Sequence, residues 1–213
     1  MSLPSAVPIR LLLLVILTAV LPSFSAAANG KALYAPCSAC HAPNGGGNRA
    51  LGAPNIAGLD AGYVAKQLED FSAGRRGAHK SDTYGAQMKA AAATLKTPAD
   101  RQAVAMFVAG LARTTPPPAP KTAANMGNGK TQFNALCSAC HNASGKGNPA
   151  LGAPRLAGTD PVYLARQLRN FRSGVRGTHP ADKMGKQMAA ISKMLPNDDA
   201  ERDVIAYIQT LKP

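Results

Sequence analysis

The stretch Cys37-Ser38-Ala39-Cys40-His41 decides the fold, because the same five residues return 100 positions later as Cys137-Ser138-Ala139-Cys140-His141. With that offset, Cys37–Leu95 aligns with Cys137–Leu195 without a gap, and 31 of the 59 aligned pairs are identical. Similarity at a fixed offset is the mark of a duplicated structural unit. The sequence therefore predicts two copies of one domain in tandem.

Each five-residue motif has the spacing of a covalent haem-attachment site. Two thiols three positions apart can form thioethers with the vinyl groups on one side of a haem, and the next histidine then lies under the iron. We expect Cys37 and Cys40 to bind one haem, with His41 as a ligand of its iron. We expect the same roles for Cys137, Cys140 and His141 at a second haem.

Three other uses of the cysteines compete with this interpretation. A thioredoxin-like Cys-x-x-Cys needs a βαβ context, and no strand pattern accompanies either motif. A zinc site made of all four sulfurs would leave the adjacent histidines without a role. Two disulfides would suit an exported chain, but they too leave the histidines unexplained. Two covalently bound haem c groups account for every residue of both motifs.

The second axial ligand must also recur in both copies. Met88 and Met188 are the only methionines that align with each other, and His79 and His179 are the other candidates. The Arg-Gly-x-His sequence before each of these histidines looks like an exposed polar loop, which favours a solvated or propionate-contacting side chain. We therefore expect Met88 and Met188 to ligate the irons, and methionine ligation raises the potential of a haem.

The N-terminus is typical of an export signal. Arg10 precedes the apolar run Leu11–Leu21, and small residues follow as far as Ala28, which is the order of a cleaved signal peptide. The apolar run is shorter than the roughly 20 residues that span a bilayer, although a retained anchor is the alternative. We expect residues 1–28 to be removed and the mature chain to lie in the periplasm.

The remaining chain is predicted to be all-α, with two tandem domains at residues 29–113 and 122–213. The proline-rich residues 114–121 between them favour an extended, semi-rigid linker. Helices are predicted in each copy from apolar residues at helical spacing. In the first copy they run near 30–36, after Asp60, over 88–95 and over 98–111; in the second they run near 130–136, after Asp160, over 188–195 and over 198–211.

The charge balance restricts the partners. The whole chain has 24 Lys and Arg against 11 Asp and Glu, and loss of the signal peptide with Arg10 leaves a formal charge of +12. Such a surface favours acidic redox proteins and peripheral association with anionic membrane faces. Nucleic acid is an unsuitable partner, because the chain is exported and its basic residues form no clustered stripe.

With these motifs in place, the chain resembles the dihaem class I cytochromes c of the cytochrome c4 type over nearly all of its mature length. The shared features are the two Cys-x-x-Cys-His motifs, the Gly-Ala-Pro-x-(Ile/Leu)-Ala-Gly loops, the Tyr-x-x-x-Gln-Leu helices and a methionine before each last helix. The resemblance implies His/Met ligation by His41 with Met88 and His141 with Met188. It also implies that the carbonyl groups of Pro54 and Pro154 orient the histidines.

The function that the resemblance implies is one-electron transfer between respiratory partners, with a quinol-oxidising complex as donor and a terminal oxidase as acceptor. A second hypothesis makes the chain the electron-accepting subunit of a flavin-linked dehydrogenase such as a sulfide dehydrogenase. A haem peroxidase would need an open iron position, which Met88 and Met188 would close. No catalytic residue pattern stands out, so we expect an electron carrier rather than an enzyme.

Overall fold

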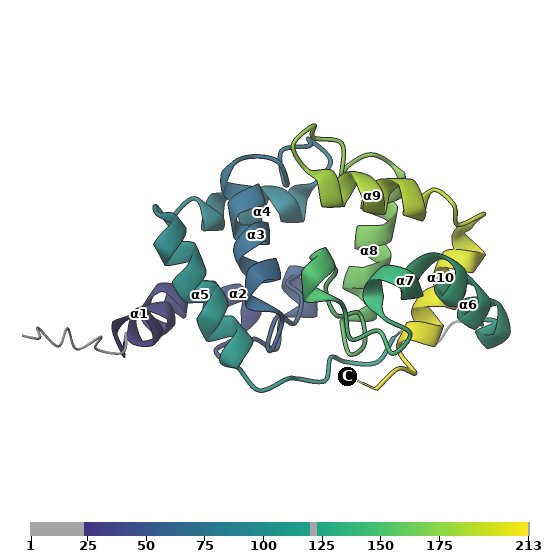
Figure 1. The fold of residues 1–213 in the computed structure, drawn as a ribbon, viewed down its shortest axis with the longest axis horizontal. Coiled ribbons are helices and arrows are strands. Elements are labelled where there is room, and N and C mark those ends of the chain that lie inside the picture. The colour runs from purple at the N-terminus through teal and green to yellow at the C-terminus, as the bar shows by residue number, and fades with distance from the viewer. Residues whose placement is uncertain (1–23, 120–122, 213) are drawn as a thin grey trace, which may run out of the picture.

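The computed structural model describes residues 24–119 and 123–212, which form two helical lobes side by side (Figure 1). The described residues hold no strand, only the isolated bridges Asn48–Ala53 and Asn148–Ala153. The all-α expectation is confirmed. The first lobe contains α1 (Phe24–Tyr34), η1 (Ala35–Cys37), α2 (Ser38–His41), η2 (Arg49–Leu51), α3 (Ala61–Ser72), α4 (Thr83–Ala92) and α5 (Pro98–Gly110). The second contains α6 (Met126–Gln132), η3 (Phe133–Cys137), α7 (Ser138–His141), η4 (Pro149–Leu151), α8 (Pro161–Arg172), α9 (Lys183–Ser192) and α10 (Asp198–Ile208).

Side-chain caps set the helix starts that matter for the site. Asp60 and Asp160 accept hydrogen bonds from the backbone at the first turns of α3 and α8, as predicted. Asp82 and Asp182 do the same for α4 and α9, where each accepts the N–H of a glycine three residues on. A cap of this kind satisfies a backbone donor that the helix itself leaves free.

These second caps correct the predicted helices over 88–95 and 188–195. Both helices begin five residues earlier, directly after the capping aspartate, and end three residues earlier. The predicted first helix of the second copy also differs, because α6 ends at Gln132 and a π-helix, η3, continues to Cys137. In the first copy Pro36 has no N–H to donate, and the chain passes into the short 3-10 turn η1 instead.

The first and last helices of each lobe cross at a glycine. A Cβ on Gly30 of α1 would lie 2.4 Å from the carbonyl oxygen of Ala103 in α5. A Cβ on Gly129 of α6 would lie 2.1 Å from that of Asp203 in α10. The missing side chain lets the two backbones approach closely, and aromatic pairs pack beside each crossing. These pairs are Tyr34–Phe107 and Phe133–Tyr207, with ring centroids 5.1 and 5.5 Å apart.

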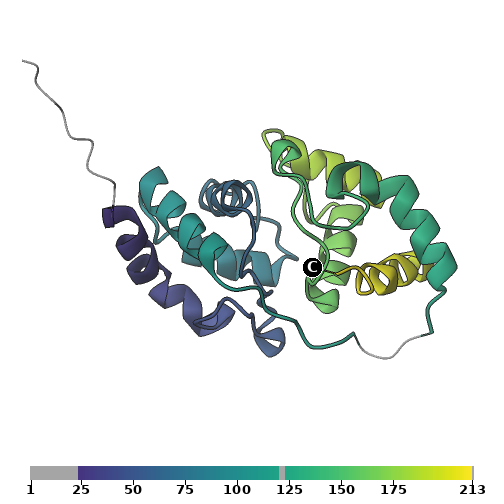
Figure 2. The same cartoon turned by 60° about the horizontal axis from the view of Figure 1, so that its bottom comes forward.

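The proline-rich connection runs along one edge of the molecule and is held there by a single arginine (Figures 1 and 2). Arg49 of the first lobe donates to the carbonyl oxygens of Pro117 and Pro118 and pairs with Asp160 of the second lobe at 2.8 Å. Lys121, within the predicted linker, lies outside the described residues. The linker is therefore fixed to both lobes along its described part.

The predicted signal peptide falls largely on residues 1–23, which lie outside the described residues. Among the residues that the structure does describe, no helix is long and apolar enough to cross a membrane.

Replacement of Gly30 by alanine should destabilise the first lobe by about 1–3 kcal/mol, the usual cost of overpacking. The matched control is Gly110→Ala at the end of α5, because a Cβ there meets nothing within 4 Å. Alanine should be neutral at that position or add up to about 1 kcal/mol of stability through its helix propensity. Denaturant unfolding of the haem-loaded protein, followed by circular dichroism, measures both; equal stability of the two variants would contradict the close crossing.

Candidate haem sites

Each motif histidine is buried and oriented by a loop carbonyl. His41 and His141 are 5% and 4% exposed, and their Nδ1 atoms lie 2.9 and 2.8 Å from the carbonyl oxygens of Pro54 and Pro154. A carbonyl can only accept, so Nδ1 carries the proton and Nε2 keeps its lone pair. Burial lowers the pKa of both histidines, which favours the neutral ring. Each Nε2 is thus prepared to bind a metal ion.

The four cysteines lie beside the histidines, and none of them is joined to another in a disulfide. Cys37 and Cys137 are half-buried, whereas Cys40 and Cys140 are exposed. Burial raises the pKa of the Cys37 thiol and raises that of Cys137 to about 11. Within residues 24–119 and 123–212 no group of three or more His, Cys, Asp or Glu side chains could share a metal ion. This arrangement gives no support to a four-sulfur zinc site.

An apolar cavity of about 230 Å³ lies over His41. Met88, on α4, also lines the cavity, and its Sδ contacts the Nε2 of His41 at 3.5 Å. Met188 occupies the matching position on α9 and is half-buried, as Met88 is. Hydrophobic side chains of α3 and of the loop before it line one part of the cavity, and residues of the second lobe, among them Leu156 and Leu164, line another.

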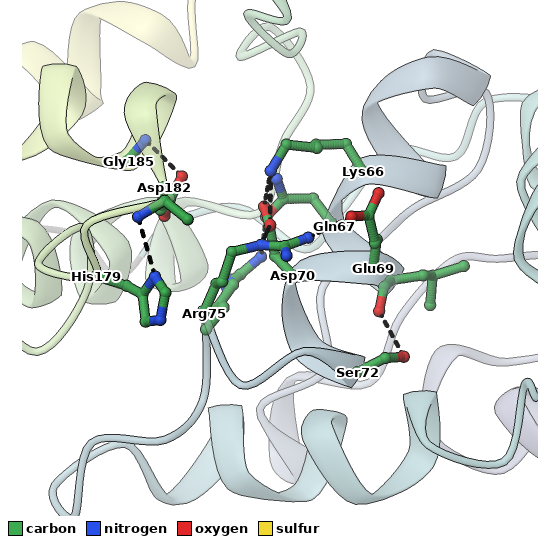
Figure 3. Close-up of polar contacts among 12 residues, drawn as sticks. Lys66, Gln67, Glu69, Asp70, Ser72, Arg75, His179, Asp182 and Gly185 are labelled. Atoms are coloured by element: carbon green, nitrogen blue, oxygen red, sulfur yellow. Dashed lines mark hydrogen bonds and ion pairs between the residues drawn. The ribbon is translucent and has the colours of Figure 1, made fainter. Parts of the chain in front are cut away.

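The rival ligands lie away from this space. His79 and His179 are exposed, and their Nδ1 atoms accept backbone N–H groups two residues on, at 3.2 and 3.1 Å. Figure 3 shows His179 on its loop beside the Asp182 cap of α9. The prediction that His79 and His179 lie exposed is therefore confirmed.

The same loop prediction is wrong for Arg76, which is buried between the lobes. Its guanidinium donates to Gln67 Oε1 of its own lobe at 2.7 Å and to Tyr163 Oη and Gln167 Oε1 of the other lobe at 3.0 and 3.1 Å. Arg176 makes the mirrored contacts, with Gln167 at 2.8 Å and Gln67 at 2.9 Å. Two arginines and two glutamines thus form a pseudo-symmetric cluster shared by the lobes.

The cluster contains no ion pair, although the charge of Asp82 is among the causes that raise the pKa of Arg76 against the effect of burial. No carboxylate lies within ion-pair distance of Arg76 or Arg176 among the described side chains, and the buried Nε of each has no partner. Burial alone would raise the pKa of Tyr163, yet the two arginines lower it overall. Because buried charges are costly without a counter-charge, the cluster fits an anionic group. Arg76 and Gln67 also line the cavity over His41, so the propionates of a haem in that cavity suit the arginines.

Sequence reasoning missed this cluster although a signal for it was present. Arg76, Gln67 and Tyr63 all recur in the second copy, as Arg176, Gln167 and Tyr163. Repetition indicates that a residue matters to the domain, but no local pattern says that it faces the other copy.

The residues after the histidine-orienting prolines also cross between lobes. Asn55 donates to the carbonyl oxygen of Gly158 at 2.8 Å and accepts the N–H of Asp160 at 3.0 Å. Arg155 donates in the opposite direction, to the carbonyl oxygen of Ala57 at 3.1 Å. The two loops that orient the histidines therefore hold the lobes together as well.

Fold and site together define a tandem of haem-binding domains, and comparison with known proteins agrees. A family model described as Cytochrome c matches residues 27–112 and again residues 126–212. The chain belongs to the cytochrome c family and carries two covalently bound haem c groups. The tandem arrangement is confirmed, whereas the boundaries at 29–113, 114–121 and 122–213 stay predictions.

The particular resemblance is to the dihaem cytochromes c4, as the sequence motifs indicated. The chain is 31% identical to cytochrome c4 of Azotobacter vinelandii over 212 residues, or 95% of this chain and 97% of that protein. It is 33% identical over 201 residues to the thiosulfate dehydrogenase electron acceptor of Stutzerimonas stutzeri (strain A1501), covering 85% of each chain. The crystal structure of reduced recombinant cytochrome c4 from Pseudomonas stutzeri matches with a TM-score of 0.66 at 27% identity, over 87% of this chain and 98% of that one. The protein is accordingly a dihaem electron carrier.

We propose that His41 with Met88, and His141 with Met188, are the axial ligand pairs, with Pro54 and Pro154 orienting the histidines. Met88→Ala and Met188→Ala should each remove about half of the weak sulfur-to-iron absorption band of the oxidised protein, because each deletes one of two equivalent ligands. Met106→Ala is the control, since Met106 is 57% exposed on α5. An unchanged band in either ligand variant would contradict the assignment at that haem.

Proposed function

We propose that this protein carries single electrons in the periplasm, taking them from a quinol-oxidising complex and passing them to a terminal oxidase. The observation that carries the proposal is the pair of matching motifs, each with a buried histidine held by a proline carbonyl, in a chain similar to the cytochromes c4. The export pattern of residues 1–28 supports the compartment. No part of the chain is needed to bind a substrate.

The chain's own contribution to electron transfer is to hold its ligands still. A bound haem supplies the one-electron change at its iron. His41 is fixed by the Pro54 carbonyl, and Met88 is fixed on a helix whose first turn is capped by Asp82. Rigid ligands keep the two oxidation states similar in geometry, which lowers the reorganisation that each transfer requires.

Partner encounter is expected at the exposed apolar residues near each site. Leu51 and Tyr84 lie exposed on the first lobe, and Leu151 and Met184 take the matching positions on the second. Lysines flank the second pair: exposed Lys183 and Lys186 lie on α9, where α4 has Thr83 and Ala86. We infer that acidic redox partners dock over the second lobe, with charge steering the approach.

The test is the rate of electron exchange with an acidic redox protein as ionic strength rises. The rate should fall with salt, and Lys183→Glu with Lys186→Glu should slow it about ten-fold at low salt, within the range of electrostatic steering. The matched control is Lys31→Glu, an exposed charge reversal on α1 at the far end of the first lobe. Salt-independent exchange, or equal slowing by the control, would contradict docking over α9.

The choice of respiratory partners has its own test. In inverted membrane vesicles the periplasmic face lies inside, where an added carrier cannot reach it. Right-side-out membranes depleted of soluble cytochromes are therefore used. Addition of the haem-loaded protein should restore quinol-driven oxygen uptake. No restoration at any concentration would contradict a place between quinol oxidation and oxygen.

The second candidate is an electron-accepting subunit of a dehydrogenase, such as a flavin-linked sulfide dehydrogenase. The similarity to a protein described as a thiosulfate dehydrogenase electron acceptor favours it. Purified dehydrogenases for sulfide and for thiosulfate should then reduce this protein in the presence of their substrates, at rates above those with an unrelated basic cytochrome. Reduction no faster than that control would exclude this candidate.

A further inference from the structure

Among the described residues, the contact that Arg166 makes with the first lobe has no counterpart under the pseudo-symmetry. Arg166 of α8, in the second lobe, donates a hydrogen bond to the carbonyl oxygen of Gly52 in the first lobe. Its guanidinium carbon also lies 4.1 Å from the ring centroid of Tyr84 on α4. A single side chain of the second lobe therefore touches two segments of the first.

The equivalent residue of the first lobe does not reach across in this way. Lys66 aligns with Arg166, and its Nζ pairs with Asp70 one turn further along its own helix, at 2.6 Å (Figure 3). Arg75 binds the same carboxylate at 2.6 Å. In the second copy the corresponding positions are Asn170 and Val175, so Arg166 has no such carboxylate in its own helix.

The two segments that Arg166 touches are those that position the proposed ligands of the first haem. Gly52 lies two residues before Pro54, whose carbonyl orients His41. Tyr84 lies one helical turn before Met88 on α4. The segments also contact each other directly, because a Cβ on Gly52 would meet the Tyr84 ring at 2.2 Å. Arg166 lies against this junction.

We infer that Arg166 is a positioning residue for the haem of the first lobe, through which the second lobe fixes the relation between the His41 loop and the Met88 helix. This inference rests on the proposed His/Met ligation. No equivalent residue acts on the haem of the second lobe, so the effect runs in one direction.

Arginine is suited to this role in a way that lysine is not. A planar guanidinium can stack on an aromatic face while one of its N–H groups donates in the plane. An ammonium group can form the hydrogen bond or approach the ring, but its tetrahedral donors do not match both at once. Charge alone is therefore insufficient, and Arg166→Lys should lose most of the effect.

The experiment measures ligand exchange separately at the two haems of the full-length, haem-loaded protein. The proton signals of the two axial methionine methyl groups are first assigned with Met88→Ala and Met188→Ala. Imidazole is then titrated into the oxidised protein, and its affinity at each haem is read from loss of the corresponding signal. In Arg166→Ala and Arg166→Lys, imidazole should bind the first haem at least about five-fold more tightly than in the unchanged protein. A five-fold change in affinity is the lower end of typical coupling between sites. The second haem should be unchanged.

Two controls separate positioning from other effects. Lys66→Ala removes the same charge at the mirrored position and should alter neither haem. Arg49→Ala breaks a different contact between the lobes, to Asp160 and the linker, and should also leave the affinity at the first haem unchanged.

The contrary results are distinct. Equal affinities in the Arg166 variants and the unchanged protein would overturn the inference, as would an equal rise in Arg49→Ala, which would indicate general loosening. Absence of methionine methyl signals from the unchanged protein would instead overturn the His/Met proposal on which the inference rests.

Discussion

The arginine pair between the lobes, in which Arg76 is buried and Arg176 half-buried, is the constraint on which the rest of the structure depends. Arg76 and Arg176 are enclosed by glutamines and a tyrosine, and each touches residues of both lobes. Neither has a carboxylate partner among the described residues. A buried cation without a close counter-charge is unfavourable, so the propionates of a bound haem would suit this interface. Arg76 both joins the lobes and lines the cavity over His41.

This constraint explains why the same short segments orient the histidines and join the lobes. Pro54 binds His41 through its carbonyl, and the next residue, Asn55, binds the opposite lobe. Pro154 and Arg155 repeat the arrangement in reverse. Asn55 and Arg155 thus bind the opposite lobe at positions next to the carbonyl groups that orient the histidines. Arg49 adds a further connection, because it binds the linker and pairs with Asp160 of the second lobe.

Local sequence patterns were sufficient for the fold class, the duplication and the positions of the buried histidines, because spacing within a motif fixes these features. The start of α4 was mispredicted, since the cap at Asp82 is a weaker signal than the apolar periodicity that follows it. Arg76 was assigned to an exposed loop because its neighbours are polar and include His79, which is exposed. Its burial depends on the second lobe, and no local pattern encodes that contact. The unequal roles of Lys66 and Arg166 likewise depend on which charged residues stand at positions 70 and 75.

The reduction potentials of the two haems in Arg76→Gln test most directly whether the charge of Arg76, held between the lobes, acts on bound haem. Loss of a buried cation favours the more positive ferric state, and Arg76 touches residues of both lobes, so both potentials should fall. Arg75→Gln, next in sequence but paired with Asp70 and Glu69 of its own lobe, should leave them nearly unchanged. Potentials that do not move in Arg76→Gln, or that move equally in Arg75→Gln, would contradict the account.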